Sequence, residues 1–168
     1  MRRLVRLTVL ALALAVPPVG LAMGGGADDG TLSVKAGIGR VFMNITGTAV
    51  GRLGKGYIRV TDPNPTDGHG FDFFGCDVEI DKSTSTSVCT SDGKDGVVRF
   101  RAIGGNYRIT INGSGIFLSA VGHGYATLNG AGDRPDIGPD GTYSVNDGPF
   151  KSLPDDLRTV PLSAPSSG

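Results

Sequence analysis

Residues 98–112 have the sequence VRFRAIGGNYRITIN, and their alternation of apolar and polar side chains decides the fold class. Val98, Phe100 and Ala102 fall on one side of an extended chain, and the two arginines between them fall on the other. Such alternation, rich in β-branched residues, is typical of half-buried strands. The pattern recurs over residues 40–45, whereas helical periodicity is nearly absent. The sequence therefore predicts an all-β protein.

Further strands are expected wherever short alternating runs are bounded by Gly, Asp or Asn. These runs lie at residues 31–36, 56–61, 71–80, 108–112, 115–120, 124–129 and 141–145. Short and closely spaced strands are typical of sandwiches and barrels. We therefore expect one domain over residues 31–162, a single β-sandwich or closed β-barrel of about eight strands.

An internal match at an offset of 68 residues indicates a duplication. Residues 40–60 align with residues 108–128 with six identities at 21 positions, and most apolar positions keep their character. Three identities are glycines, and the others pair Arg40 with Arg108, Asn44 with Asn112 and Tyr57 with Tyr125. One copy could not bury its apolar face alone. We therefore expect two pseudo-twofold halves of one core, near residues 32–62 and 100–130.

The N-terminus has the features of a secretory signal peptide. Three arginines precede the apolar run of residues 7–16, which is too short to span a bilayer, and small residues follow. Residues 1–22 are the expected signal, with Ala27 as an alternative cleavage position. We expect a flexible segment at residues 23–30, a disordered tail at residues 163–168, and a secreted or envelope location.

Charge and composition limit the classes of function. Loss of the signal leaves 13 basic and 16 acidic residues, a net charge of −3. That balance does not predict a nucleic-acid binder, and no apolar run after the signal is long enough for a transmembrane helix. No phosphate-binding glycine loop occurs either. The sequence predicts no cofactor.

The two cysteines are expected to form a disulfide. Cys76 and Cys89 enclose twelve residues that include the polar run STSTS, which favours a turn. An exported protein meets an oxidising environment, where such a pair forms a bridge. A metal pair or a reactive thiol is the alternative, but the chain lacks the further ligands that zinc needs.

Arginines mark the most specific candidate site. Arg99, Arg101 and Arg108 occupy the polar phase of two strands that the Ile-Gly-Gly-Asn segment would join as a hairpin, and Arg40 and Arg59 lie on equivalent strands of the other repeat. These five residues predict a face that binds an anionic envelope polymer. A solvated face balanced by nearby Asp is the alternative.

Other candidate chemistry is weaker. The 15 Asp residues suit a loop-rich protein, because Asp stabilises turns. Calcium binding is an alternative for two loose series, neither of which has the spacing of a calcium loop: Asp133, Asp136 and Asp140, and Asp62, Asp67 and Asp72. His69 and His123 lack metal-ligand spacing, and Ser114 lacks the surroundings of a hydrolase nucleophile.

One family of small secreted bacterial proteins resembles this chain. The resemblance is carried by RFRAIGGNYRI at residues 99–109, GSGIFLSAVGHG at residues 113–124, DGTYSV at residues 140–145 and the Leu-Pro pair at residues 153–154. It covers roughly residues 30–162. It implies a secreted all-β domain, without an activity or catalytic residues.

Together these patterns predict a secreted, non-catalytic binding or structural module. One alternative is an extracellular hydrolase that uses loop carboxylates. Another is a structural subunit that assembles through its edge strands. A concave pocket with paired carboxylates would favour the hydrolase, whereas an arginine-bearing sheet face would favour the binding module.

Overall fold

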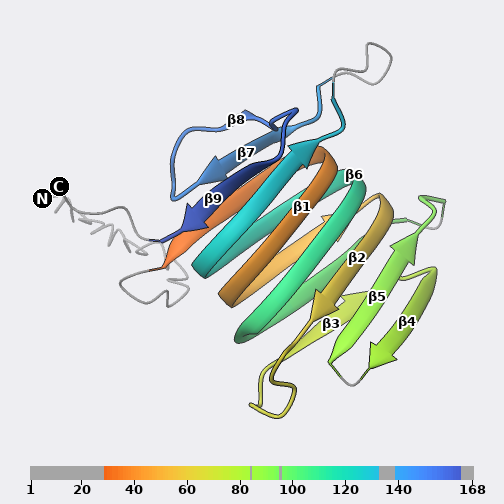
Figure 1. The fold of residues 1–168 in the computed structure, drawn as a ribbon. Coiled ribbons are helices and arrows are strands. Elements are labelled where there is room, and N and C mark those ends of the chain that lie inside the picture. The colour runs from red at the N-terminus through yellow and green to blue at the C-terminus, as the bar shows by residue number, and fades with distance from the viewer. Residues whose placement is uncertain (1–28, 84, 95, 133–138, 164–168) are drawn as a thin grey trace, which may run out of the picture.

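The computed structural model describes residues 29–83, 85–94, 96–132 and 139–163. In these residues the sheet is built from two very long strands and several short ones, all antiparallel (Figure 1). The strands are β1 (Gly30–Leu53), β2 (Lys55–Thr61), β3 (Gly70–Phe74), β4 (Val78–Ser83), β5 (Thr86–Ser91), β6 (Val98–Gly130), β7 (Thr142–Val145), β8 (Lys151–Ser152) and β9 (Arg158–Leu162). The prediction of an all-β protein is confirmed.

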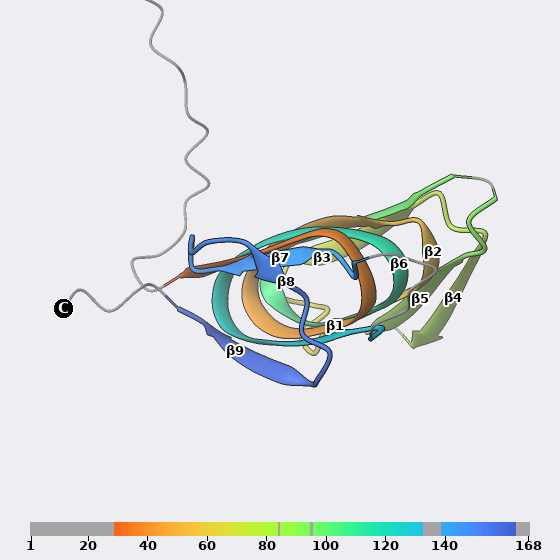
Figure 2. The same cartoon turned by 90° about the horizontal axis from the view of Figure 1, so that it is seen from above.

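The strands β1 and β6 wind round a common interior instead of lying flat (Figure 2). Residues 39–47 of β1 lie between residues 105–113 and 122–130 of β6, and this ladder extends to β2, β5, β4 and β9; we call it the first wall. Residues 48–53 of β1 lie between residues 98–102 and 117–121 of β6. This ladder extends to β3 on one side and through residues 30–38 to β7 and β8 on the other; we call it the second wall.

Two rows of glycines lie where the long strands cross from one wall to the other. Paired neighbours form the rows Gly30–Gly122–Gly47–Gly105 and Gly130–Gly39–Gly113–Gly56. A Cβ atom on Gly47 would overlap the carbonyl oxygen of Val121 and lie 2.7 Å from the Cα atom of Gly122. The backbones at these bends are therefore too close for side chains, in keeping with the use of Gly where strands approach closely.

The interior between the walls is apolar. Both walls contribute to a single cluster of buried side chains that includes Met43, Ile45, Ile109 and Ile111 from the first wall and Leu32, Phe100 and Leu118 from the second. Residues predicted to face inward, such as Val98 and Ala102, are fully buried. Alternate residues over most of β1 and β6 therefore fill the core, and the intervening residues form the outer faces.

The sheet is not closed into a barrel, which was one of the two predicted forms. The strand order runs from β4 to β8, and these two ends do not pair with each other. Residues 71–80, predicted as one strand, form β3 and β4 with a break at residues 75–77. The polar run at residues 83–87 predicted a turn, but Thr86 and Ser87 belong to β5. These two residues directly precede Val88 and Cys89, which are buried in the sheet.

The predicted disulfide is present. Cys76 and Cys89 are bonded, with Cα atoms 5.4 Å apart, and Cys89 is fully buried. The bridge ties the segment between β3 and β4 to the centre of β5. A disulfide is compatible with an extracellular location. In the described part of the chain, no helix has the length and apolar character needed to traverse a bilayer. The predicted signal peptide at residues 1–22 lies outside the described residues, as does the predicted tail of residues 163–168 after its first residue.

Candidate functional site

The five arginines predicted to form one face lie on two different walls. Arg99 and Arg101 project from the second wall, whereas the first wall carries Arg40, Arg59 and Arg108. All five are exposed. The expected hairpin between residues 98–102 and 108–112 does not form, because β6 continues through Gly104 and Gly105 into the other wall. The predicted face is therefore two separate surfaces.

On the second wall, two adjacent arginines lie between two phenylalanines in one row across neighbouring strands. Phe74 of β3 pairs with Arg99 of β6, Arg99 pairs with Arg52 of β1, and Arg52 pairs with Phe117 of β6. The guanidinium carbon of Arg52 lies 4.1 Å from the centroid of the Phe117 ring. Lys35 extends this row, with its ammonium nitrogen 3.9 Å from the ring centroid of Phe150.

Beside this row the sheet surface is hollowed. The next outward row runs from Asp72 and Arg101 to Val50, Ser119 and Ser33. Its last three side chains are much shorter than those of the row that contains Arg52 and Phe117. The resulting open groove has a volume of about 580 Å³, within the range of small-molecule sites. We call it the cationic groove, and its exposed lining consists mainly of Ser33, Lys35, Val50, Arg52, Phe74, Arg99, Phe117 and Ser119.

Positive charge in the cationic groove is not balanced locally. None of its lining residues is acidic. Within the described ranges, Arg52 and Arg99 have no ion pair, although they are direct cross-strand neighbours. Like charges in this position destabilise a sheet unless an anion lies between them. Two adjacent guanidinium groups over an apolar floor are chemically suited to a carboxylate, sulfonate or phosphate attached to an apolar group.

Arg101, by contrast, is already paired. Its Nε atom donates to Oδ2 of Asp72 at 2.8 Å. Both residues border a second hollow of about 330 Å³, which is also lined by His69. That hollow contains a single carboxylate, and Arg101 neutralises it. This second hollow therefore lacks the two carboxyl groups with different pKa values that a glycosidase needs.

The aspartates of the candidate calcium series have structural roles where they are described. Oδ1 of Asp62 accepts a hydrogen bond from the backbone of Asn64 at 2.8 Å, and Oδ2 of Asp140 accepts one from Gly132 at 2.8 Å. Asp133 and Asp136 lie outside the described residues. No group of three or more His, Cys, Asp or Glu residues in the described ranges could hold a metal ion. Asp therefore contributes to turns at these described positions.

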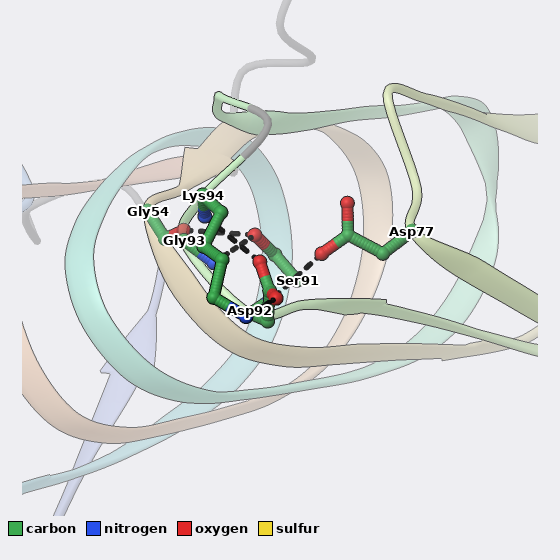
Figure 3. A network of polar contacts seen from close by, with 6 residues as sticks. All are labelled: Gly54, Asp77, Ser91, Asp92, Gly93 and Lys94. Atoms are coloured by element: carbon green, nitrogen blue, oxygen red, sulfur yellow. Dashed lines mark hydrogen bonds and ion pairs between the residues drawn. The ribbon is translucent and has the colours of Figure 1, made fainter.

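The carboxylates of Asp77 and Asp92 both accept hydrogen bonds at the turn that follows β5 (Figure 3). The backbone N–H of Asp92 donates to Oδ2 of Asp77 at 2.6 Å, while Lys94 bonds the Asp92 carboxylate at 2.8 Å through both its ammonium and its backbone N–H. The Lys94 ammonium is the main reason that the pKa of Asp92 lies below its usual value. A general acid needs a raised pKa. This exposed pair is therefore suited to holding a turn and not to proton donation.

The remaining predicted candidates do not join the groove. Ser114 lies at a bend, where its carbonyl oxygen accepts a hydrogen bond from Gly54 at 3.1 Å. His123 contacts Asp29 at 3.3 Å on an exposed part of β6. Neither histidine lines the cationic groove. The groove residues Lys35, Arg52, Phe74 and Phe117 were not singled out from the sequence, whose only signal for them was an outward position in a strand.

Comparisons with protein-family models, with curated proteins and with solved structures find no match. No compared protein therefore indicates a function for this chain, and a function has to be inferred from its geometry.

Proposed function

We propose that this protein is an exported, non-catalytic binding module whose cationic groove holds an amphiphilic anion. The observation that carries the proposal is the direct pairing of Arg52 with Arg99 beside an apolar hollow that contains no carboxylate. A bound anion would remove the repulsion between the two guanidinium groups, and Phe74 and Phe117 would contact the apolar part of the ligand. The signal peptide expected from the sequence and the disulfide support export.

The hydrolase alternative receives less support. The groove is larger than the hollow beside Arg101, and neither a carboxylate nor a histidine lines it. Asp77 and Asp92 both accept hydrogen bonds at the turn after β5, and Asp92 has a lowered pKa. The module therefore retains a ligand without transforming it.

The binding test uses 8-anilino-1-naphthalenesulfonate, which combines an anionic head with an aromatic body. Its affinity is measured by calorimetry for the wild-type protein and for the double variant R52Q/R99Q. We expect at least a tenfold loss of affinity, because each charge-assisted contact contributes about 1.5–3 kcal/mol. The matched control, R40Q/R59Q, removes the same charge from the first wall and is expected to bind as the wild type does.

Two results would refute the groove as the site. One is equal affinity in the groove variant and the first-wall control, which would mean that net charge alone attracts the probe. The other is equally tight binding of a naphthylammonium cation, since the groove offers that ligand only repulsion. Circular dichroism of each variant would show that the sheet is intact.

We also propose that the two walls are a sandwich produced by internal duplication. Pairings in one copy have counterparts in the other: Tyr57 pairs with Asn112, and Tyr125 pairs with Asn44. Likewise Arg40 pairs with Asn112, and Asn44 pairs with Arg108. Exchange of the two copies therefore maps these pairs onto each other, as a pseudo-twofold axis would. Phe42 and Thr110 are matching positions that pair with each other, so the axis passes near them.

A further inference from the structure

The outer face of the first wall carries two copies of one arrangement of side chains. Tyr57 of β2, Asn112 of β6 and Arg40 of β1 are successive cross-strand neighbours. Tyr125 of β6, Asn44 of β1 and Arg108 of β6 are successive neighbours in the same way. We call these the first and second triads. They differ by an offset of 68 residues at every position.

The residues of the triads are the three non-glycine identities of the internal match, and none of them belongs to the buried core. By contrast, buried residues at matching positions of the two copies differ: Val41 corresponds to Ile109, and Met43 corresponds to Ile111. A core tolerates exchange among apolar residues of similar volume. An exposed residue is not held by packing in that way. Other outward positions of the same match differ, as Phe42 corresponds to Thr110 and Arg59 to Thr127. Apart from glycines, identity is therefore confined to the triads, which indicates that their particular chemistry is used.

The polar groups of the triads are available to a ligand. In the described part of the chain, the side chains of Asn44, Asn112, Arg40 and Arg108 make no hydrogen bond or ion pair. The central row between the triads is Arg59–Thr110–Phe42–Thr127, and the ring of Phe42 lies 6.0 Å from that of Tyr125. Among the described residues, the rows of the two triads and the central row contain no acidic residue. An anionic partner therefore complements its charge.

We infer that each triad is a binding site for an acidic polysaccharide, separate from the cationic groove. The tyrosine ring offers an amphipathic surface to a sugar ring, the asparagine amide both donates to and accepts from hydroxyl groups, and the arginine binds a carboxylate or phosphate on the sugar through paired N–H groups. Charge alone would not require the tyrosine and asparagine to be repeated with the arginine.

The geometry further predicts two independent sites. Three strand spacings across the sheet and four residues along it place the two tyrosines roughly 20 Å apart. Because the triads are related by a half-turn, a chain bound at one runs opposite to a chain bound at the other. A directional polymer cannot satisfy both in the same way along one straight path, so the face holds two antiparallel segments.

The test is calorimetric titration of the mature protein with tetragalacturonate. We expect two sites per chain in the wild type. We expect one site in Tyr57→Ala and one in Tyr125→Ala, with affinity at the altered triad reduced at least tenfold. The double variant should lose both sites. The groove variant R52Q/R99Q should keep both, so failure of this inference and failure of the proposed groove function are distinguishable.

Two comparison ligands separate sugar recognition from simple attraction of charge. The methyl ester of tetragalacturonate retains the rings without the charge, and tetra-aspartate retains the charge without the rings; both are expected to bind at least tenfold more weakly. Absence of saturable binding by tetragalacturonate would overturn the inference. So would a stoichiometry that the tyrosine substitutions leave unchanged, or equal affinity for tetra-aspartate. Urea midpoints of the variants would verify that they remain folded.

Discussion

Replacing Gly47 by alanine tests the close approach of strands at the bends. Gly47 lies between Gly105 and Gly122, with a φ angle of +150°. An alanine there would adopt a strained backbone conformation, which costs about 1–3 kcal/mol. Its Cβ atom would also overlap the Val121 carbonyl oxygen and crowd Gly122, and such overpacking costs about 1–3 kcal/mol more.

The combined cost of backbone strain and overpacking is a large fraction of the free energy of unfolding of an ordinary domain, which is about 5–15 kcal/mol. Urea unfolding of the disulfide-intact protein, followed by circular dichroism, measures it. For a slope of about 2 kcal/mol/M, a loss of 4 kcal/mol lowers the midpoint by about 2 M.

Two other glycines separate strain from crowding. Gly68 has a φ angle of +82° with open space around its Cβ position, so Gly68→Ala should show only the conformational cost. Gly70 has open space and no positive φ angle, so Gly70→Ala should change stability by no more than about 1 kcal/mol. If Gly47→Ala destabilises the protein no more than Gly68→Ala, the reasoning about crowding at the bends is refuted.

Three further outcomes follow from particular contacts. Tyr107→Phe should cost about 1–3 kcal/mol in urea unfolding, because the buried hydroxyl donates its one hydrogen to the carbonyl oxygen of Gly70 at 2.8 Å or to that of Ile103 at 3.1 Å; an unchanged midpoint would contradict this. Burial raises the pKa of Tyr107, so its contribution is present below pH 10 and is lost as the pH rises through the folded pKa; alkaline titration should therefore destabilise the wild type more than Tyr107→Phe. Lys94→Ala should raise the pKa of Asp92 in an NMR titration, whereas Lys35→Ala should not. Replacing both Cys76 and Cys89 by alanine should cost about 3 kcal/mol, and loss below 1 kcal/mol would show that the bridge constrains the unfolded chain little.

The local part of the fold was predictable because burial leaves a period-two signature in the sequence. Val98, Phe100 and Ala102 were expected to face inward, and all three are buried. The disulfide was predictable because the expected signal peptide and a short cysteine spacing both favour it. These features depend on neighbours in sequence and on the environment, not on the path of the whole chain.

The path of the long strands was not predictable from glycines alone. The inward phase of β6 changes from even positions before Gly104 to odd positions after it, because that residue forms a bend with a φ angle of +74°. A hairpin turn and a bend that preserves pairing both favour glycine. Only pairing with β1 on both sides of the bend distinguishes them, and pairing between distant segments is absent from local sequence patterns.

The cationic groove was missed for a related reason. Phe74, Arg52 and Phe117 come from three strands and meet Arg99 only because of the observed register. A shift of one residue would turn each side chain to the other face. The sequence predicted one face of five arginines, but it could not divide them between the two walls.

The two surfaces differ in their relation to the proposed duplication, and this difference sets their expected stoichiometries. Across the offset of 68 residues, the groove residues Lys35, Arg52, Arg99 and Phe117 correspond to Ile103, Ala120, Thr31 and Ala49. The chemistry of the groove therefore occurs once in the chain, whereas the triads occur twice. If the copies diverged on the second wall and kept their chemistry on the first, one molecule binds one amphiphilic anion and two polysaccharide segments.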